Sequence, residues 1–509
     1  MTYKPRTVAK AHQRAAIAAC DAKPPVPAPT DVFAYLCEQG TGKSKIVLDE
    51  WGEMASAGGS QDLLLIAPKG SIRNWFTDKS KDESQWSEIR KHMDPEFHER
   101  LVHHTWVGSG AGWKKQMDAL LRMQDKKRPR ALFVNVEALS NGNDKALKLC
   151  LEFVEQRGAH VVVDESTSIR NSSNRTDSVV EIGNLALSKR ILSGLWAPKS
   201  PMDLFWQCMF LDERILGYDN FYTFRRRYAQ LKKMRTFIGF VSGKEKYREF
   251  QMITGFQNQD ELSAKVAKYS YRVLKKDCLD LEPKVYTSRD VELTAEQKKM
   301  MKEIKLFGHT AVPGRDDRFV TTDLVIKRIT RELQICTGFV VDDEERVLHE
   351  VPERKTDALM EVLEDHVGDV IIWCPWHAPL QKIVARLTKE YGAKSVAQFH
   401  GKNTKTRHEE ERRFLNDPEC LYMVATQGAG MRGNTWINAN LTVYYCNNYD
   451  LEQRTQSEDR NHRIGQINRV TYVDLITQGT IENKVIQNLR NKIDLVTAIN
   501  QEGHQAWLI

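Results

Sequence analysis

The sequence lacks any apolar run that approaches the roughly 18 residues of a membrane-spanning helix. Its first residues, Met1 to Pro5, lack the apolar core of a secretory signal, and no two of its nine cysteines form a C-x-x-C pair. These absences exclude a membrane-spanning protein and indicate neither a zinc knuckle nor a disulfide framework. We therefore expect no membrane partner, cysteines in a reducing compartment and a cytoplasmic location.

Short-period repeats and low-complexity tracts are absent as well, apart from a brief Pro-rich loop at 24–29. The 509 residues, 41% hydrophobic and 28% charged, fit a globular chain of about three domains. Lys and Arg outnumber Asp and Glu by 75 to 68, a formal net charge of +7. So small an excess fits a nucleic-acid binder and an ordinary enzyme alike, and the distribution of charge matters more than its sum.

The fold class follows from short, almost continuous apolar runs separated by longer helical patterns. Strands buried on both faces of a parallel sheet have this composition. The pattern predicts an α/β protein with two parallel-sheet lobes and a helical insertion between them. We place the lobes at 1–211 and 351–492, the mostly helical insertion and linker at 212–350, and a tail at 493–509. The runs are 34–36, 63–67, 131–135, 160–164, 369–374, 420–425, 441–445 and 470–473.

Inside the predicted insertion, basic side chains are interleaved with aromatic ones from Arg225, Arg226 and Arg227 onward to Arg248. A solvated surface and a nucleic-acid contact explain this run equally well.

The segment Cys37–Ser44 follows the first predicted strand and precedes a helix. Its Gly40, Thr41 and Gly42 allow backbone N–H groups to close around phosphate oxygens, Lys43 neutralises phosphate charge, and the Ser44 hydroxyl can ligate Mg²⁺. Cys37 stands where the eight-residue phosphate-loop pattern has Gly, which weakens the motif taken alone.

Two further segments carry the residue types of nucleotide hydrolysis. Asp164 and Glu165 end a buried strand, where the first can hold Mg²⁺ through water and the second can polarise the attacking water. Arg460 and Arg463, three apart, are expected on one helical face from which they could reach a phosphate bound by the other lobe. Taken singly, a strand-end turn or a solvated helix would explain each segment.

Together these segments resemble the superfamily 2 helicase-type ATPases, specifically the Swi/Snf-like branch of double-stranded DNA translocases, over roughly residues 11–492. The resemblance implies RecA-like lobes, ATP with Mg²⁺ between them, and DNA across both. Further similar segments are 66–75, 135–139, 164–171, 193–198, 271–284, 331–336, 399–407, 426–434, 456–466 and 480–484.

The resemblance also implies roles for single residues. Gln13 would contact the adenine, Ser193 and Gly194 would couple hydrolysis to movement, and Gln456 would act with the two arginines of its segment. The DNA backbone would be gripped by the remaining candidates, Lys69, Arg73, Asn171 and Gly430, beside the three arginines from 225 to 227.

This chain departs from the family pattern at coupling positions more than at hydrolytic ones. Thr167 replaces the usual histidine of the Asp-Glu motif, Leu195 and Trp196 stand where Thr-Pro is usual, and the segment after Gly430 matches loosely. Histone-reading and RING insertions are absent, and so compact a motor is expected in bacteria, archaea or their viruses.

We therefore expect a DNA-stimulated ATPase that translocates on duplex or branched DNA without sequence preference and remodels or displaces bound complexes. We expect a monomer, with a protein that recruits it as a further partner. A strand-separating helicase acting on DNA or RNA, and a nucleic-acid clamp without turnover, are the alternatives. The branch-specific segment 271–284 disfavours the first, and the set of Lys43, Asp164, Glu165 and Arg463 disfavours the second.

Overall fold

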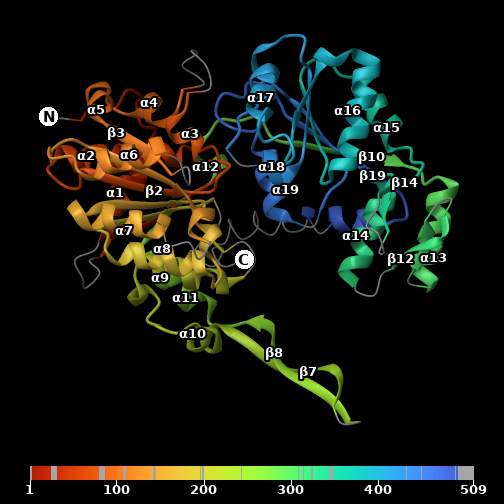
Figure 1. Cartoon of the computed structure of the whole chain (residues 1–509), viewed down its shortest axis with the longest axis horizontal. Helices are drawn as coiled ribbons and strands as arrows, with labels where there is room; N and C mark the ends of the chain where they lie inside the picture. Colours follow the sequence, from red (N-terminus) through yellow and green to blue (C-terminus); the bar gives the residue numbers. More distant parts are fainter. Residues whose placement is uncertain are drawn as a thin grey trace. The chain divides into compact units, whose positions relative to one another are not determined.

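The computed structural model describes residues 3–24, 31–78, 86–106, 111–140, 145–194, 196–197, 200–241, 244–307, 309–312, 315–321, 325–342, 348–431, 433–448, 450–487 and 489–490. The predicted tail at 493–509 lies outside these ranges. The chain divides into two compact units, the first within Met1–Cys278 and the second within Leu279–Asp494. Figure 1 shows the helices and strands of both units.

Unit 1 is built on a parallel seven-stranded sheet in the order β3-β4-β2-β5-β6-β1-β9. Its strands are β1 (Asp31–Cys37), β2 (Asp62–Ala67), β3 (Val102–Thr105), β4 (Arg130–Asn135), β5 (Ala159–Asp164), β6 (Ser188–Leu192) and β9 (Ser270–Val273). Its helices are α1 (Ala11–Asp21), α2 (Lys43–Ser56), α3 (Arg73–Phe76), α4 (Glu88–His92), α5 (Pro95–Arg100), α6 (Ala111–Leu121), α7 (Lys145–Arg157), α8 (Asn174–Asn184), α9 (Leu204–Leu211), α10 (Phe221–Tyr228), α11 (Gln259–Ala267) and α12 (Lys275–Cys278).

Helices cover both faces of this sheet (Figure 1). One apolar cluster joins the sheet to α1, α2, α3, α4 and α5, and another joins its opposite face to helices that include α7, α8 and α9. Since β1, β2, β4 and β5 are buried on both faces, their continuous apolar runs are explained.

Unit 2 has a parallel six-stranded sheet in the order β10-β19-β18-β15-β17-β16. The strands are β10 (Val285–Val291), β15 (Val370–Trp373), β16 (Val396–Phe399), β17 (Tyr422–Ala425), β18 (Leu441–Tyr444) and β19 (Thr471–Thr477). The helices are α13 (Ala295–Phe307), α14 (Val325–Cys336), α15 (Lys355–Glu364), α16 (His377–Tyr391), α17 (Arg407–Asn416), α18 (Gln427–Gly430) and α19 (Leu451–Glu458). The prediction of an α/β fold with two parallel sheets is confirmed.

The region 212–350 differs from the mostly helical insertion that we predicted. It contains a long antiparallel hairpin of β7 (Ala229–Val241) and β8 (Lys244–Phe256), and the shorter pairs β11 (His309–Val312) with β12 (Arg315–Thr321) and β13 (Phe339–Val341) with β14 (Leu348–Glu350). The boundary between the units falls inside the region, at 278/279. The density of charged residues obscured the strands, because apolar residues there alternate with charged ones rather than forming runs.

A buried histidine in β5 makes the stability of unit 1 dependent on pH. The side chain of His160 is 0% exposed, and its Nδ1 lies 2.7 Å from Ser188 Oγ. Burial lowers the pKa of His160 to about 4. The folded unit therefore binds this proton less readily than the unfolded chain, whose histidines titrate near pH 6.5.

We predict that the free energy of opening β5, measured by native-state hydrogen exchange, is highest above about pH 6.5 and falls as the pH drops towards 4. A shift of this size corresponds to about 3 kcal/mol. His160→Gln should remove that part of the pH dependence, whereas His104→Gln, on the edge strand β3, should retain it. An unchanged slope in His160→Gln would contradict the assignment.

Candidate functional site

The loop between β1 and α2 has the backbone of an anion-binding turn. Gly40 and Gly42 adopt φ angles of +80° and +89°, in the left-handed region that favours glycine. A Cβ added to Gly42 would lie 2.3 Å from Nε2 of Gln13, so a larger residue there would also displace the Gln13 amide. The loop leads into the N-terminus of the 14-residue helix α2, whose first N–H groups suit phosphate oxygens.

Two side chains of α1 support this loop from behind. His12 Nε2 lies 2.8 Å from the carbonyl oxygen of Thr41, and the Gln13 amide donates to the same oxygen at 3.1 Å. Both side chains are buried. Gln13 thus lies beside the phosphate loop, and its contact with an adenine stays a prediction. His12 was missed as a loop support because a lone histidine has no distinctive spacing.

Lys43 and Glu165 lie at the same edge of the sheet although 122 residues separate them. Lys43 Nζ donates to the carbonyl oxygen of Cys37 at 3.0 Å, at the base of the loop. Gln39 Nε2 donates to Glu165 Oε1 at 3.1 Å and so joins the loop to the end of β5. Glu165 has a φ of 51°, a strained conformation for a residue with a side chain. Strained backbone of this kind is common at functional sites, where it fixes the direction of a side chain, here that of Glu165.

The carboxylate of Asp164 is the most perturbed acid at this edge. It is 9% exposed, and Trp75 Nε1 donates to its Oδ2 at 3.3 Å. Burial and then the charge of Glu165 raise the pKa of Asp164 to about 7, while Lys43 acts in the opposite direction. Two adjacent, partly buried carboxylates supply oxygen acceptors of the kind that a hydrated divalent cation takes. Ser44 lies in the first turn of α2, one residue beyond Lys43.

The predicted coupling residues lie between the phosphate loop and the acidic pair. Strand β6 lies between β1 and β5 in the sheet, and Ser193 follows it. The Ser193 N–H donates to the carbonyl oxygen of Tyr35 at 3.2 Å. A Cβ on Gly194 would lie 3.4 Å from the Gln39 backbone nitrogen, so this loop touches the phosphate loop. The structure therefore brings together the candidate residues of three separate sequence segments.

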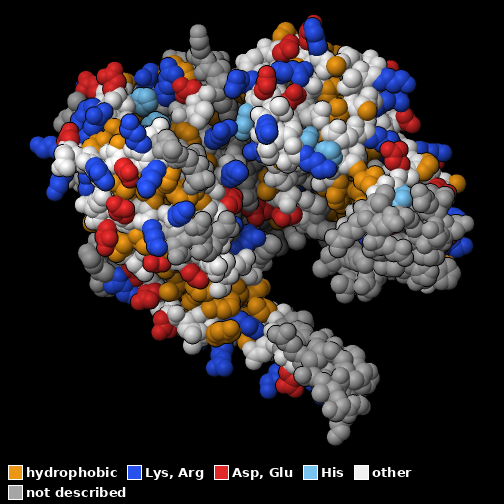
Figure 2. All heavy atoms as spheres, viewed as in Figure 1, with side chains coloured by type: hydrophobic (Ala, Val, Ile, Leu, Met, Phe, Trp, Pro, Cys, Tyr) orange, Lys and Arg blue, Asp and Glu red, His pale blue; other side chains and the backbone are white. Residues whose placement is uncertain are grey.

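The nucleic-acid candidates of unit 1 fall into two groups. Lys69, Arg73 and Asn171 are exposed and follow β2 or β5. The arginines of α10 lie near the base of the β7–β8 hairpin, where Figure 2 shows apolar side chains gathered. Arg225 Nη2 donates to the Gln251 carbonyl oxygen at 3.0 Å, Arg227 pairs with Glu261, and Arg226 is exposed. Arg225 and Arg227 thus have structural partners in addition to any role at a nucleic acid.

In unit 2, the structure corrects the expectation that Arg460 and Arg463 share a helical face. Helix α19 ends at Glu458, and both arginines lie in the turn that follows. The turn nevertheless directs them to one place, because Arg460 Nη1 and Arg463 Nη1 donate to the Asn434 carbonyl oxygen at 2.9 and 3.3 Å. Arg460 Nε also donates to the carbonyl oxygen of Gln456 at 2.8 Å, so the two motif residues are joined directly.

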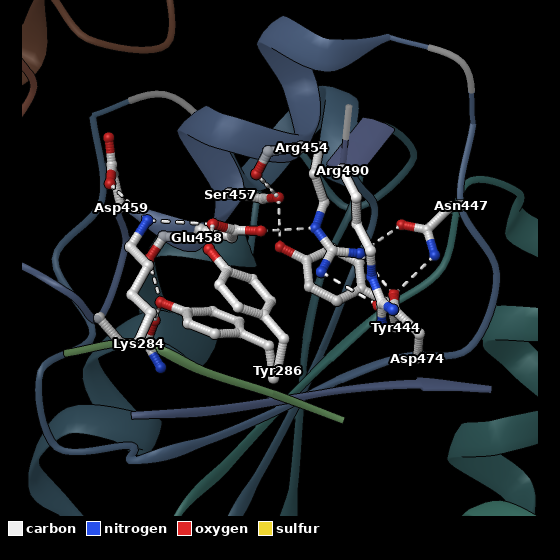
Figure 3. Close-up of polar contacts among 12 residues, drawn as sticks. Lys284, Tyr286, Tyr444, Asn447, Arg454, Ser457, Glu458, Asp459, Asp474 and Arg490 are labelled. Carbon is white, nitrogen blue, oxygen red and sulfur yellow. Dashed lines mark hydrogen bonds and ion pairs between the residues drawn. The ribbon is translucent and has the colours of Figure 1, made fainter. Parts of the chain in front are cut away.

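A buried ion network, drawn in Figure 3, fixes α19. Arg454 Nε donates to Glu458 Oε1 at 2.7 Å, its Nη1 donates to Asn447 Oδ1 at 2.7 Å, and its guanidinium pairs with Asp474 of β19. The guanidinium also lies 3.6 Å from the centre of the Tyr444 ring. The network was missed from the sequence because its members lie on β18, α19 and β19, and only the fold brings them together.

A cavity of about 760 Å³ opens at the carboxyl edge of the unit 2 sheet. Lys402 and Arg407 supply cations to its wall, and His377 and His400 lie with ring centres 4.8 Å apart. Gly430 follows the lining residue Ala429, and a Cβ added to it would lie 2.8 Å from the Trp373 ring. The cavity is lined by Thr330, Leu333, Pro375, Trp376, His377, His400, Gly401, Lys402, Arg407, Thr426, Gly428, Ala429, Asn448 and Gln453.

Within the described ranges, no group of three or more His, Cys, Asp and Glu side chains could hold a metal ion by itself. Nor does any helix there have both the length and the apolar character needed to cross a membrane.

Comparison with known proteins identifies part of unit 2. Residues 354–465 match the family described as helicase conserved C-terminal domain. The chain is 22% identical over 275 residues to the CHD3-type chromatin-remodeling factor PICKLE of Arabidopsis thaliana, covering 50% of this chain and 19% of that protein. It is 30% identical over 92 residues to the SWI/SNF chromatin-remodeling complex subunit snf22 of Schizosaccharomyces pombe, covering 18% and 5%.

A third relative, TATA-binding protein-associated factor mot1 of Aspergillus fumigatus, is 34% identical over 92 residues, covering 18% of this chain and 5% of that protein. The chain thus spans a fifth or less of the length of these relatives. The Sulfolobus solfataricus SWI2/SNF2 ATPase core in complex with dsDNA aligns over 99% of this chain and 95% of that one, at 19% identity and a TM-score of 0.41.

We predict that Arg454→Met destabilises unit 2 by about 3 kcal/mol, because the buried Asp474 then keeps only the half-exposed Arg490, at 3.7 Å, as a cationic partner. The measurement is hydrogen exchange of the β18 and β19 amides. Arg289 of β10, the strand next to β19, forms an exposed ion pair with Glu361 of α15. Arg289→Met removes this pair and should lower the stability of unit 2 by less than about 1 kcal/mol. Equal effects of the two substitutions would show that burial does not set the strength of the Arg454 network.

Proposed function

Because the chain is a homologue of Swi/Snf-type ATPases with a helicase conserved C-terminal domain at 354–465, we propose that it hydrolyses ATP and uses the reaction to translocate on double-stranded DNA. The convergence of Lys43, Asp164 and Glu165 at one edge of the unit 1 sheet carries the proposal. Without this convergence the fold would support a nucleotide-binding or nucleic-acid-binding protein equally well.

Each residue at this edge has one proposed task. The N–H groups around Gly40–Gly42 and the Lys43 ammonium hold the triphosphate. Mg²⁺, when bound, would be held by Ser44 and by Asp164 through water, and it would neutralise charge on the phosphate oxygens. Glu165, held by Gln39 in a single orientation, directs a water towards the terminal phosphorus. Gln13 is proposed to contact the adenine.

The arginines of unit 2 are proposed to complete hydrolysis. Arg460 and Arg463 share the Asn434 carbonyl, which fixes both guanidinium groups in one small region. Positive charge held in this way stabilises charge that develops on the transferred phosphoryl group. Gln456, whose carbonyl accepts from Arg460, is proposed to support the same step.

We further propose that DNA is held through its phosphates and without sequence preference. Lys69, Arg73, Asn171 and Arg226 are exposed in unit 1 and can serve as phosphate contacts. In unit 2, the cavity walled by Lys402 and Arg407 offers cations to the phosphates. Gly430, which follows the lining residue Ala429, is proposed as a backbone contact. Translocation would remodel or displace whatever is bound to the duplex. Ser193, which bonds to β1, and Gly194, which lies against the phosphate loop, would link translocation to hydrolysis.

We predict that Lys43→Ala and Glu165→Gln each lower the DNA-stimulated ATPase rate by about a hundredfold to a thousandfold or more, since each removes a group that acts on the transferred phosphate. DNA binding should stay within about twofold, because neither side chain is among the proposed phosphate contacts. Lys148→Ala, an exposed lysine of α7, is the matched control and should retain full activity. Normal turnover in either active-site variant would refute the site.

We predict that duplex and branched DNA stimulate the ATPase more than single-stranded DNA or RNA does, and that a third strand is displaced from a triplex while a forked duplex is not unwound. Efficient unwinding of the fork would favour a strand-separating helicase instead.

Lys402→Ala should weaken DNA binding at all sequences alike and lower the salt slope of binding by about one. Lys389→Ala on the exposed face of α16 should change neither quantity.

A further inference from the structure

The chain enters unit 2 through residues 279–286, called here the entering segment, and this segment lies against the turn that carries the two arginines. Unit 2 begins at Leu279, and β10 begins at Val285. Lys284, the last residue before the strand, extends its side chain towards the end of α19 (Figure 3). The contact joins residues that are 174 positions apart in the sequence.

The ammonium group of Lys284 binds two successive carboxylates. Its Nζ lies 3.0 Å from Glu458 Oε2 and 3.5 Å from Asp459 Oδ1, and both acids are 1% exposed. Tyr286 OH donates to the same Glu458 oxygen at 2.8 Å, and Tyr472 OH donates to the Glu458 carbonyl at 2.8 Å. The last residue of α19 and the first residue of the turn are therefore fixed from the entering segment and from β19.

A second contact is made by His462, two residues after Arg460 in the sequence. His462 Nε2 lies 2.9 Å from the Glu282 carbonyl oxygen. The entering segment thus binds Glu458 and Asp459 on one side of Arg460 and His462 on the other. Arg460 lies between these contacts, and Arg463 follows directly after the second of them.

We propose that Lys284 is a positioning residue: with the Glu282 carbonyl, it fixes the turn that carries Arg460 and Arg463 to the segment by which the chain enters unit 2. The proposal rests on the proposed hydrolysis of ATP, in which these arginines act on the phosphate. A displacement of the entering segment is transmitted through these contacts to the arginine turn.

The charges around Glu458 indicate that Lys284 can be substituted without unfolding α19. Burial alone would raise the pKa of Glu458, yet Lys284 and then Arg454 hold it below its usual range. If Lys284 is removed, Arg454 still lies 2.7 Å from Glu458 and Tyr286 OH still donates to it, so this buried carboxylate keeps one cationic partner and one hydroxyl partner. The fold of α19 should therefore survive a substitution that releases the turn from the entering segment.

The test compares two lysines of unit 2 that each bind a buried carboxylate. Lys355 Nζ contacts Glu482 at 2.5 Å and the carbonyl oxygens of Tyr445 and Leu475 at 2.9 and 3.1 Å. None of these four residues lies in the arginine turn. Lys284→Met, Lys284→Arg, Lys355→Met and the surface control Arg289→Ala would be prepared in the full chain.

We expect Lys284→Met to lower the DNA-stimulated kcat about tenfold to a hundredfold with the KM for ATP within about twofold, as for a misplaced catalytic group. Lys284→Arg, which keeps the charge, should recover most of this loss. Lys355→Met should destabilise unit 2 but retain kcat at temperatures where it is folded, and Arg289→Ala should be unchanged. Equal losses of kcat in the two methionine variants would overturn the proposal, as would full kcat in Lys284→Met.

Hydrogen exchange separates this proposal from the proposed function. The amides of 458–463 should exchange about tenfold faster in Lys284→Met than in the unsubstituted chain, while those of β15 and β17 stay protected. Unaltered exchange at 458–463 would refute the positioning role whatever the activity. An unsubstituted chain without ATPase activity would refute the proposed function, and the exchange result would still decide whether Lys284 holds the turn.

Discussion

Parallel pairing is the constraint on which the candidate sites depend, because it brings the carboxyl ends of all strands in a sheet to one edge. In unit 1, only β6 lies between β1 and β5. The phosphate loop and the acidic pair are therefore about two strand spacings of roughly 4.8 Å apart. The loop after β6 occupies the space between them. In unit 2 the same constraint collects the loops after β15, β16, β17 and β18 around one cavity.

Buried ion pairs fix the strands that carry these loops. Beneath the phosphate loop, Arg190 of β6 donates to Glu50 of α2 at 2.8 Å, and Tyr35 of β1 donates to the same carboxylate at 2.9 Å. One carboxylate thereby sets β1, α2 and β6 relative to one another. A buried pair adds little net stability over an apolar substitute, but it tolerates few alternative arrangements. Such pairs therefore suit positions where loops must be held in register.

The sequence predicted most of the fold wherever burial produces apolar runs. β1, β2, β4 and β5 and, in unit 2, β15, β17, β18 and β19 all coincide with such runs. β6 was not predicted because Lys189 and Arg190 interrupt it, and their partners become visible only in the fold. The phosphate loop and the acidic pair were predicted because each is a local pattern. The shared carbonyl of Arg460 and Arg463 was not, since it depends on where α19 ends.

Lys284 and Lys355 show why a role in function cannot be inferred from burial or charge alone. Each binds a buried carboxylate of unit 2. Burial, the largest single effect, lowers the pKa of each lysine, but the surrounding acidic groups, with that carboxylate foremost, together raise the pKa above its usual range. They differ in what lies behind the carboxylate. Glu482 follows β19, whereas Glu458 ends the helix that leads to Arg460. Two ion pairs of the same kind therefore have different roles. The Lys355–Glu482 pair stabilises the interior of unit 2, whereas the Lys284–Glu458 pair orients the two arginines from the segment by which the chain enters unit 2.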